Sequence, residues 1–147
     1  MSKIAHGTWV IVADGQKALV FRNKGDALYI NLELMWQVDQ KNPPSHEQGS
    51  DRPTRVHQSV GAARSTAAST DWHQAAEDEF ANRLAADLYV HAHKGDFAHL
   101  VLIAPPKALG IIRGALHPEV RQRLIAESAK TLTQHPVIEI ERFLATL

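Results

Sequence analysis

The amino-acid sequence predicts an α/β fold, in which a mixed five-stranded sheet lies between layers of helices. Two short segments, Trp9–Ala13 and Leu100–Ala104, are apolar at every position, which is typical of strands that are covered on both faces. Along the rest of the chain, strand patterns and helical apolar spacing follow one another in the order β-β-β-α-β-α-β-α. Together these patterns indicate three layers, α/β/α, with the sheet in the middle.

Two strands joined by a tight turn begin the predicted fold. The first strand is expected at Thr8–Asp14 and the second at Lys17–Asn23. Between them lies Asp14-Gly15, and Asp-Gly between two β-prone runs is a strong hairpin signal.

A third strand is expected at Leu28–Val38, after a turn at Asn23–Asp26. Apolar residues occupy every second position of this stretch, and a period of two predicts a half-buried strand. The polar side of the strand favours an edge position. Such an edge could pair with a second copy of the chain, and the sequence leaves the oligomeric state open.

The segment Asp39–Thr70 is expected to be a long, flexible loop. It holds two adjacent prolines, two glycines and many polar residues, without apolar periodicity. A loop of this length inside a compact domain is usually functional or mobile. Its charged residues lean towards the basic: Lys41, Arg52, Arg55 and Arg64 against Glu47 and Asp51, with His46 and His57 alongside. Two interpretations stay open, a solvated loop and a segment that becomes ordered on an anionic partner such as RNA.

A long amphipathic helix is expected at Asp71–His93, with its cap at residue 70 or 71. Apolar residues recur at every fourth position from Trp72 through Phe80 to Leu88. Trp72 is interpreted as the first core residue of this stripe. Stacking of its ring on a nucleic-acid base is the alternative.

The second half of the chain is expected to add two strands and two helices. Residues 119–121 are interpreted as a short turn, and Thr133 or His135 as the cap of the last helix. The expected elements are a strand at Leu100–Ala104, a helix at Pro106–Leu116, a strand at Arg123–Ala129 and a helix from Val137 to near Thr146.

A meander of three strands followed by right-handed crossovers predicts the strand order 3-2-1-4-5. This order places Trp9–Ala13 at the centre, where its continuous apolar run requires it to be. The predicted architecture is therefore ribonuclease-H-like. A length of 147 residues indicates a single domain, 1–147.

The composition excludes several classes of protein. Sixteen basic residues balance sixteen acidic ones, so any affinity for nucleic acid would have to come from a local patch. There are no cysteines, which excludes disulfides and thiolate metal sites. No run is long enough to insert in a membrane, and the first residues lack a signal-peptide pattern, so a cytoplasmic location is expected.

A nuclease is the first enzymatic hypothesis that this fold raises. Two-metal phosphodiester chemistry needs several carboxylates at the ends of the central strands. Asp14 lies at one such end, but the end of the other central strand, Ile103-Ala104-Pro105, carries no carboxylate. Asp14 is therefore interpreted mainly as a turn residue.

Other catalytic and cofactor patterns give only weak signals. The nine histidines lack metal-ligand spacing such as HxxxH, and the glycines never form a nucleotide-binding loop. No GxSxG motif is present. We therefore expect no metal, no cofactor and no catalytic residues, and we favour a protein that is not an enzyme.

Several segments together resemble the bacterial family called "protein required for attachment to host cells". The resemblance covers nearly the whole chain, and the segment that begins at Leu100 is its most specific part. The segments are Trp9–Asp14 with Ala18–Phe21, Thr70–His73 leading to Phe80, Leu100–Gly110, Leu116–Val120, and Ala129–Thr133.

That family is in turn similar to the middle domain of archaeal and eukaryotic peptide-chain release factors. In those factors the loop between the third strand and the first helix carries a Gly-Gly-Gln motif, which promotes peptidyl-tRNA hydrolysis. The corresponding stretch here, Asp39–Thr70, has Gly61-Ala62-Ala63-Arg64 and no Gly-Gly-Gln, while Gln48 and Gln58 lack paired glycines. The resemblance thus implies the fold and a link to translation, and this departure puts hydrolysis in doubt.

The leading hypothesis is a small, non-enzymatic binding protein that acts on RNA, on a ribosomal surface or on a protein partner. The contacts are expected from the 39–70 loop, at Arg52, Arg55, His57 and Arg64. The alternatives are a degenerate release-factor-like hydrolase or metal-dependent nuclease, and a factor that supports attachment to host cells indirectly.

Overall fold

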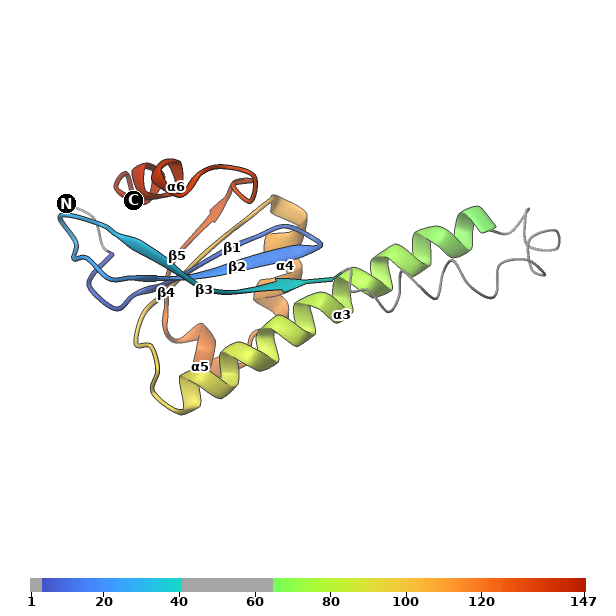
Figure 1. Cartoon of the computed structure of the whole chain (residues 1–147). Coiled ribbons are helices and arrows are strands. Elements are labelled where there is room, and N and C mark those ends of the chain that lie inside the picture. The colour runs from blue at the N-terminus through green and yellow to red at the C-terminus, as the bar shows by residue number, and fades with distance from the viewer. Residues whose placement is uncertain (1–3, 41–64) are drawn as a thin grey trace.

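The computed structural model describes residues 4–40 and 65–147 (Figure 1). Within these residues, five strands form one mixed sheet with the order β3-β2-β1-β4-β5, which confirms the predicted fold class and strand order. The strands are β1 (Trp9–Ala13), β2 (Lys17–Asn23), β3 (Leu32–Asp39), β4 (Leu100–Ala104) and β5 (Leu124–Ala129). The helices are α3 (Ser65–His93), α4 (Pro106–Ala115), α5 (Pro118–Arg121) and α6 (Val137–Leu144).

Strand β1 lies at the centre of the sheet. It pairs antiparallel with β2, where Ile11 faces Val20, and parallel with β4, where Ile11 faces Leu102. All five β1 residues are buried, and the most exposed of them, Trp9, is only 4% exposed. The continuous apolar run was therefore a correct signal of a strand covered on both faces.

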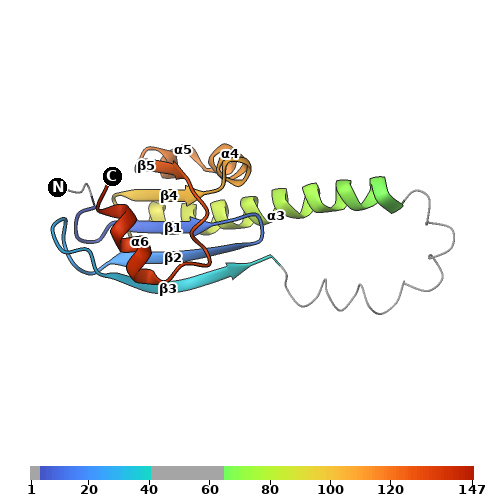
Figure 2. The ribbon, with the colours of Figure 1, turned by 90° about the horizontal axis from the view of Figure 1, so that it is seen from above.

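Helices cover both faces of the sheet, so the three-layer prediction is also confirmed. Trp9, Ile11 and Ala13 point towards α3, α4 and α5, in a cluster that includes Leu84 and Ile112. The intervening β1 side chains face a second cluster built on α6. Figure 2 shows α6 on one side of the strands and α3 on the other.

The connection between β2 and β3 differs from the prediction, because the expected third strand, Leu28–Val38, was too long at its start. Strand β3 begins at Leu32, and the side chains of Leu28 and Tyr29 are 69% and 74% exposed. The period-two pattern was misleading here because hydrogen bonds from a buried polar side chain hold residues 23–31 in a turn.

That polar side chain belongs to Asn23, which is fully buried. Its Oδ1 accepts hydrogen bonds from the backbone N–H groups of Gly25 and Asn31, both at 2.9 Å. Its Nδ2 donates to the carbonyl oxygens of Ile4 at 2.9 Å and of Ala5 at 3.3 Å. One amide group therefore ties the β2–β3 turn to the N-terminal segment.

Asp26 completes the same turn. Its Oδ1 accepts hydrogen bonds from the backbone N–H groups of Tyr29 and Leu28, at 2.8 and 2.9 Å. These bonds, first that of Tyr29 and then that of Leu28, hold the pKa of the Asp26 carboxyl below its ordinary value. Because the pKa is lowered in the folded protein, this contribution to stability is present above the ordinary carboxyl pKa and is lost as the pH falls through the lowered one.

Helix α3 begins at Ser65, which corrects the expected start at residue 71 and the expected cap at residue 70 or 71. The last six residues of the predicted loop Asp39–Thr70 are thus helical. Alanines at 67 and 68 favour a helix, and no proline or glycine interrupts the chain from Ser65 to His93. The apolar spacing begins only at Trp72, so it placed the start of the helix too late.

The second half of the chain follows the prediction with small differences. The expected turn at 119–121 lies within the short helix α5, whose N-cap His117 accepts a hydrogen bond from the Glu119 N–H through Nδ1 at 3.0 Å. Helix α6 has Pro136 as its N-cap, without a side-chain hydrogen bond. The expected capping role of Thr133 or His135 was therefore wrong.

We expect Asn23→Ala to lower the free energy of unfolding by about 2–3 kcal/mol, because it leaves several buried backbone groups without partners. Denaturant unfolding measures this change. Asn31→Ala is the matched control, since the Asn31 side chain is exposed, and should cost no more than about 0.5 kcal/mol. Equal effects of the two substitutions would contradict the role given to Asn23.

Candidate functional site

The predicted contact residues Arg52, Arg55, His57 and Arg64 lie outside the described residues. The structure does describe the two elements that flank them. Strand β3 ends at Asp39 and α3 begins at Ser65. The end of β3 and the start of α3 both lie towards the same end of the molecule (Figures 1 and 2). The flanks of the predicted binding segment are therefore fixed by the fold.

Helix α3 extends well beyond the part of it that packs on the sheet (Figure 1). Its 29 residues span about 43 Å at 1.5 Å per residue. Among the residues of α3 whose side chains are described, the buried ones begin at Phe80, while Trp72, Gln74 and Ala75 are exposed. The buried ones are Phe80, Ala81, Leu84, Ala85, Leu88 and Ala92.

Trp72 is 64% exposed, which corrects its interpretation as a core residue. The apolar stripe of α3 does continue back to Trp72, but no packed layer of the described residues covers this side chain. Single exposed apolar side chains are common on proteins, but this one lies on the part of α3 that follows the predicted binding segment in the sequence. Trp72 thus becomes a candidate contact residue.

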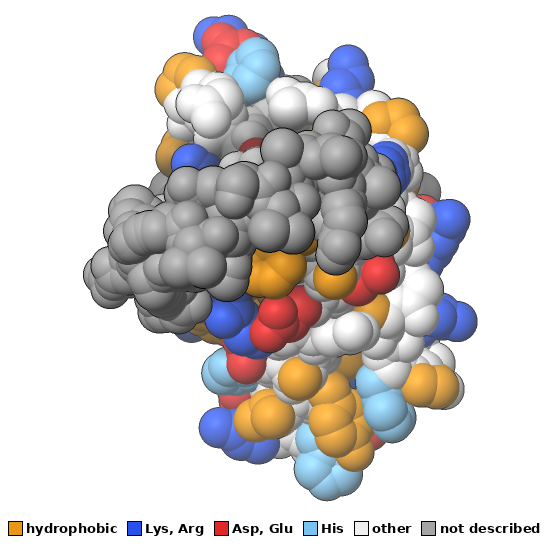
Figure 3. All heavy atoms as spheres, turned by 90° about the vertical axis from the view of Figure 1, so that its right-hand side faces the viewer, with side chains coloured by type: hydrophobic (Ala, Val, Ile, Leu, Met, Phe, Trp, Pro, Cys, Tyr) orange, Lys and Arg blue, Asp and Glu red, His pale blue; other side chains and the backbone are white. Residues whose placement is uncertain are grey.

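The charges near the base of this extension are mixed. Glu77, Asp78 and Glu79 follow one another on α3, and the Gln74 amide donates to an Asp78 carboxylate oxygen at 3.1 Å. The guanidinium of Arg83 donates to the carbonyl oxygen of Asp39 at 3.3 Å, which joins α3 to the end of β3. Figure 3 faces this end of the molecule and shows acidic and basic side chains side by side.

Asp14, the residue at the position where a nuclease would hold metal, has a structural role. Its Oδ1 accepts hydrogen bonds from the backbone N–H groups of Gln16 and Lys17, each at 2.8 Å. Its Oδ2 accepts one at 2.9 Å from the hydroxyl of Thr133, which is 6% exposed. The turn interpretation of Asp14 is thus supported, and the carboxylate also fastens the segment before α6 to the sheet.

Neither a metal site nor a membrane-spanning helix is present in residues 4–40 and 65–147. No group of three or more His, Asp or Glu side chains in these ranges could hold a metal ion. No helix in the same ranges is long and apolar enough to cross a membrane.

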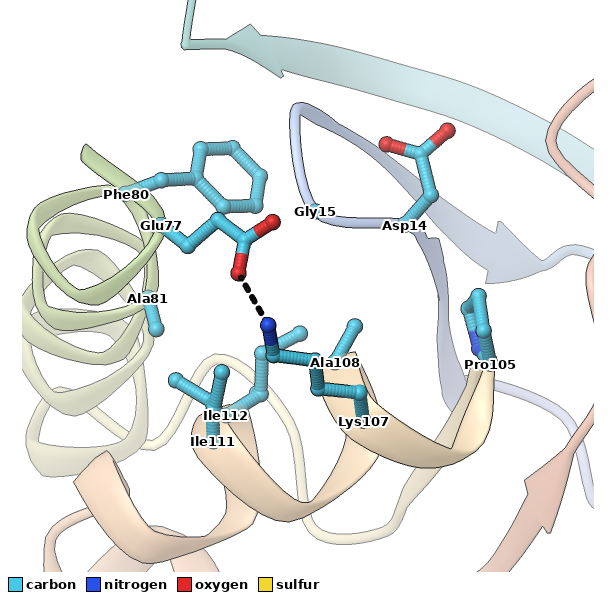
Figure 4. A pocket seen from close by; sticks show the side chains of 10 residues that line it. All are labelled: Asp14, Gly15, Glu77, Phe80, Ala81, Pro105, Lys107, Ala108, Ile111 and Ile112. Atoms are coloured by element: carbon cyan, nitrogen blue, oxygen red, sulfur yellow. Dashed lines mark ion pairs between the residues drawn. The ribbon is translucent and has the colours of Figure 1, made fainter. Parts of the chain in front are cut away.

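A pocket lies between α3, α4 and the β1–β2 turn (Figure 4). Its volume is about 190 Å³, and an ion pair joins Glu77 Oε1 of α3 to Lys107 Nζ of α4 at 3.5 Å. Sequence reasoning missed it because its walls come from segments far apart in the chain. The lining residues are Asp14, Gly15, Glu77, Phe80, Ala81, Pro105, Lys107, Ala108, Ile111 and Ile112.

We expect Asp14→Ala to lower the free energy of unfolding by about 1–3 kcal/mol, because three donors lose their acceptor. Thr133→Val should cost about 1 kcal/mol alone and much less in the Asp14→Ala background, since its partner is then already gone. Denaturant unfolding of the two single variants and the double variant measures this coupling. Asp87→Ala serves as a control carboxylate on α3; strictly additive effects of Asp14 and Thr133 would contradict the described contact.

Comparisons with known proteins agree with this architecture. The archaeal translation termination factor aRF1 has a similar structure, with a TM-score of 0.50 and 14% sequence identity. The similarity covers 95% of this chain and 36% of the factor, so the chain spans about a third of that protein. At this identity the likeness shows the fold alone. No curated protein gives a significant sequence match.

The family comparison is more specific. The model of the family described as "Bacterial archaeo-eukaryotic release factor family 12" matches residues 7–144, which include every strand of the sheet. The match names release factors and not attachment to host cells, so the host-attachment part of the resemblance stays a prediction. The chain belongs to the bacterial archaeo-eukaryotic release factor family 12.

Proposed function

We propose that this protein is a non-enzymatic binding module of the translation apparatus, which contacts ribosomal RNA through residues 41–72. We call this stretch the contact segment. The observation that carries the proposal is the exposed Trp72 on a part of α3 that packs against nothing in the described sheet. A helix that carries an exposed aromatic ring beyond its packed part is suited to reach a partner.

The chemistry of the contact segment supports RNA as this partner. Residues 41–64 carry four basic and two acidic residues, whereas the whole chain has sixteen of each. The basic residue nearest to Trp72 is Arg64, and Asp71 directly precedes Trp72, so the whole contact segment carries four basic and three acidic residues. Arginines neutralise phosphates, and an aromatic ring stacks on unpaired bases of any sequence. The combination fits single-stranded loops of structured RNA.

The family relation supports a place in translation. A release-factor family name and the fold of a termination factor point to the ribosome as the setting, and thus to the cytoplasm as the place of action. The chain lacks Gly-Gly-Gln, which supports binding without peptidyl-tRNA hydrolysis. A role in attachment to host cells would, in this proposal, be an indirect result of altered translation.

The first test is co-sedimentation with ribosomes at low salt. We expect the variant with alanine at Arg52, Arg55, His57 and Arg64 to lose most of the binding, because three phosphate contacts and one further donor are gone. Each lost phosphate contact also lowers the slope of log affinity against log salt, by roughly 0.7–0.9. The control is the triple variant Lys24→Ala, Lys94→Ala, Lys130→Ala, which removes three positive charges from exposed positions on the folded body.

This comparison separates a local contact from a general charge effect. The proposal requires that the control variant binds like the wild type. Absence of binding by the wild type, or equal losses in the two variants, would overturn it.

The second test concerns Trp72. We expect Trp72→Ala to weaken binding to ribosomes by roughly fivefold to a hundredfold, since base stacking contributes about 1–3 kcal/mol per base. The melting temperature should stay within about 2 °C, because the ring is exposed. Tyr29→Ala is the matched control, as Tyr29 is an aromatic residue with 74% exposure on the β2–β3 turn. A loss of binding in the control, or none in Trp72→Ala, would contradict the assignment.

A further inference from the structure

We propose that the pocket between α3, α4 and the β1–β2 turn binds a small ligand with a compact apolar body and a cationic head. The proposal is separate from the RNA contact, because Trp72, the residue of the contact segment whose side chain the structure describes, does not line this pocket. Its basis is an apolar floor combined with a rim carboxylate, Glu77, whose ion pair with Lys107 is long and exposed.

The floor of the pocket is apolar and buried. Phe80 and Ala81 of α3 and Ile112 of α4 are at most 2% exposed, and Ala108 is 9% exposed. Figure 4 shows these side chains around a common space. A dry cavity of about 150 Å³ with apolar walls is known to accept benzene. The 190 Å³ present here therefore suits one ring with a short side chain.

The rim of the pocket carries one carboxylate and one ammonium group, from Glu77 and Lys107, while the Asp14 carboxylate is directed away from the pocket (Figure 4). The Asp14 oxygens already accept three hydrogen bonds within the protein. Glu77 is different, because its partner among the described residues, Lys107, lies 3.5 Å away and has a side chain that is 69% exposed. Such an exposed ion pair contributes little to stability, so a cationic head can replace the Lys107 ammonium beside Glu77.

The backbone at Gly15 helps to place the Glu77 carboxylate over the pocket. A Cβ atom at residue 15 would lie 3.1 Å from Glu77 Oε2, which is tighter than an ordinary contact. The glycine thus allows the carboxylate to lie against the β1–β2 turn. This location is at the carboxyl ends of the parallel strands β1 and β4, where open α/β sheets commonly bind small ligands.

The experiment uses three probes that share a phenyl ring and a two-carbon chain. They are 2-phenylethylamine with a cationic head, 2-phenylethanol with a neutral head and 3-phenylpropionate with an anionic head. Amide resonances of Gly15, Ala81 and Ala108 in a ¹H–¹⁵N NMR titration of the full chain report occupancy of the pocket. We expect the amine to shift these resonances and to bind roughly fivefold more tightly than the alcohol, with the acid weakest.

A pair of variants tests the part played by Glu77. Glu77→Gln should remove the preference for the amine over the alcohol, while binding of the alcohol is unchanged. Glu79→Gln, an exposed carboxylate on the same helix that does not line the pocket, should leave the preference intact. The proposal is overturned if no probe shifts the lining resonances, if the acid binds as well as the amine, or if the two variants behave alike.

Discussion

The structure depends on the burial of β1 between two apolar layers. Each of its five residues is buried, and alternate side chains enter separate clusters on the two faces of the sheet. A fully buried Val or Ile side chain stabilises a protein by about 1.5–3 kcal/mol, so this strand is a large share of the core. No charged residue occurs along it, and the charged side chains lie on the outer strands, at the strand ends and on the helices.

Helix α3 connects this core to the proposed function. Its second half packs on β1 through Phe80, Leu84 and Leu88, while its first half continues past the edge of the sheet. The core thus fixes the direction of the helix, and the helix carries Trp72 away from the body. The pocket forms where these two parts of α3 meet, between Phe80 and α4. The proposed contact segment and the proposed ligand pocket therefore share one helix.

The core could be predicted from the sequence because buried positions are occupied mainly by apolar residues. The apolar runs at Trp9 and Leu100 located the two central strands, and the order of elements then gave the sheet. Features that depend on single polar contacts could not be predicted in this way. The Asn23 amide holds the residues before Leu32 in a turn, although their alternating apolar pattern predicts a strand. The hydroxyl of Thr133 donates to Asp14, a residue 119 positions away in the sequence. The exposure of Trp72 and the Glu77–Lys107 pair follow from helix placement, which periodicity does not specify.

The most direct measurement is ultraviolet crosslinking of the full chain to purified ribosomes, with the crosslinked peptides identified by mass spectrometry. The account predicts RNA-linked peptides from residues 41–64 and from the α3 peptide that contains Trp72, and none from β5 or α6 on the opposite part of the fold. Crosslinks that come mainly from β5 or α6, or the absence of RNA-linked peptides under conditions in which the protein sediments with ribosomes, would contradict it.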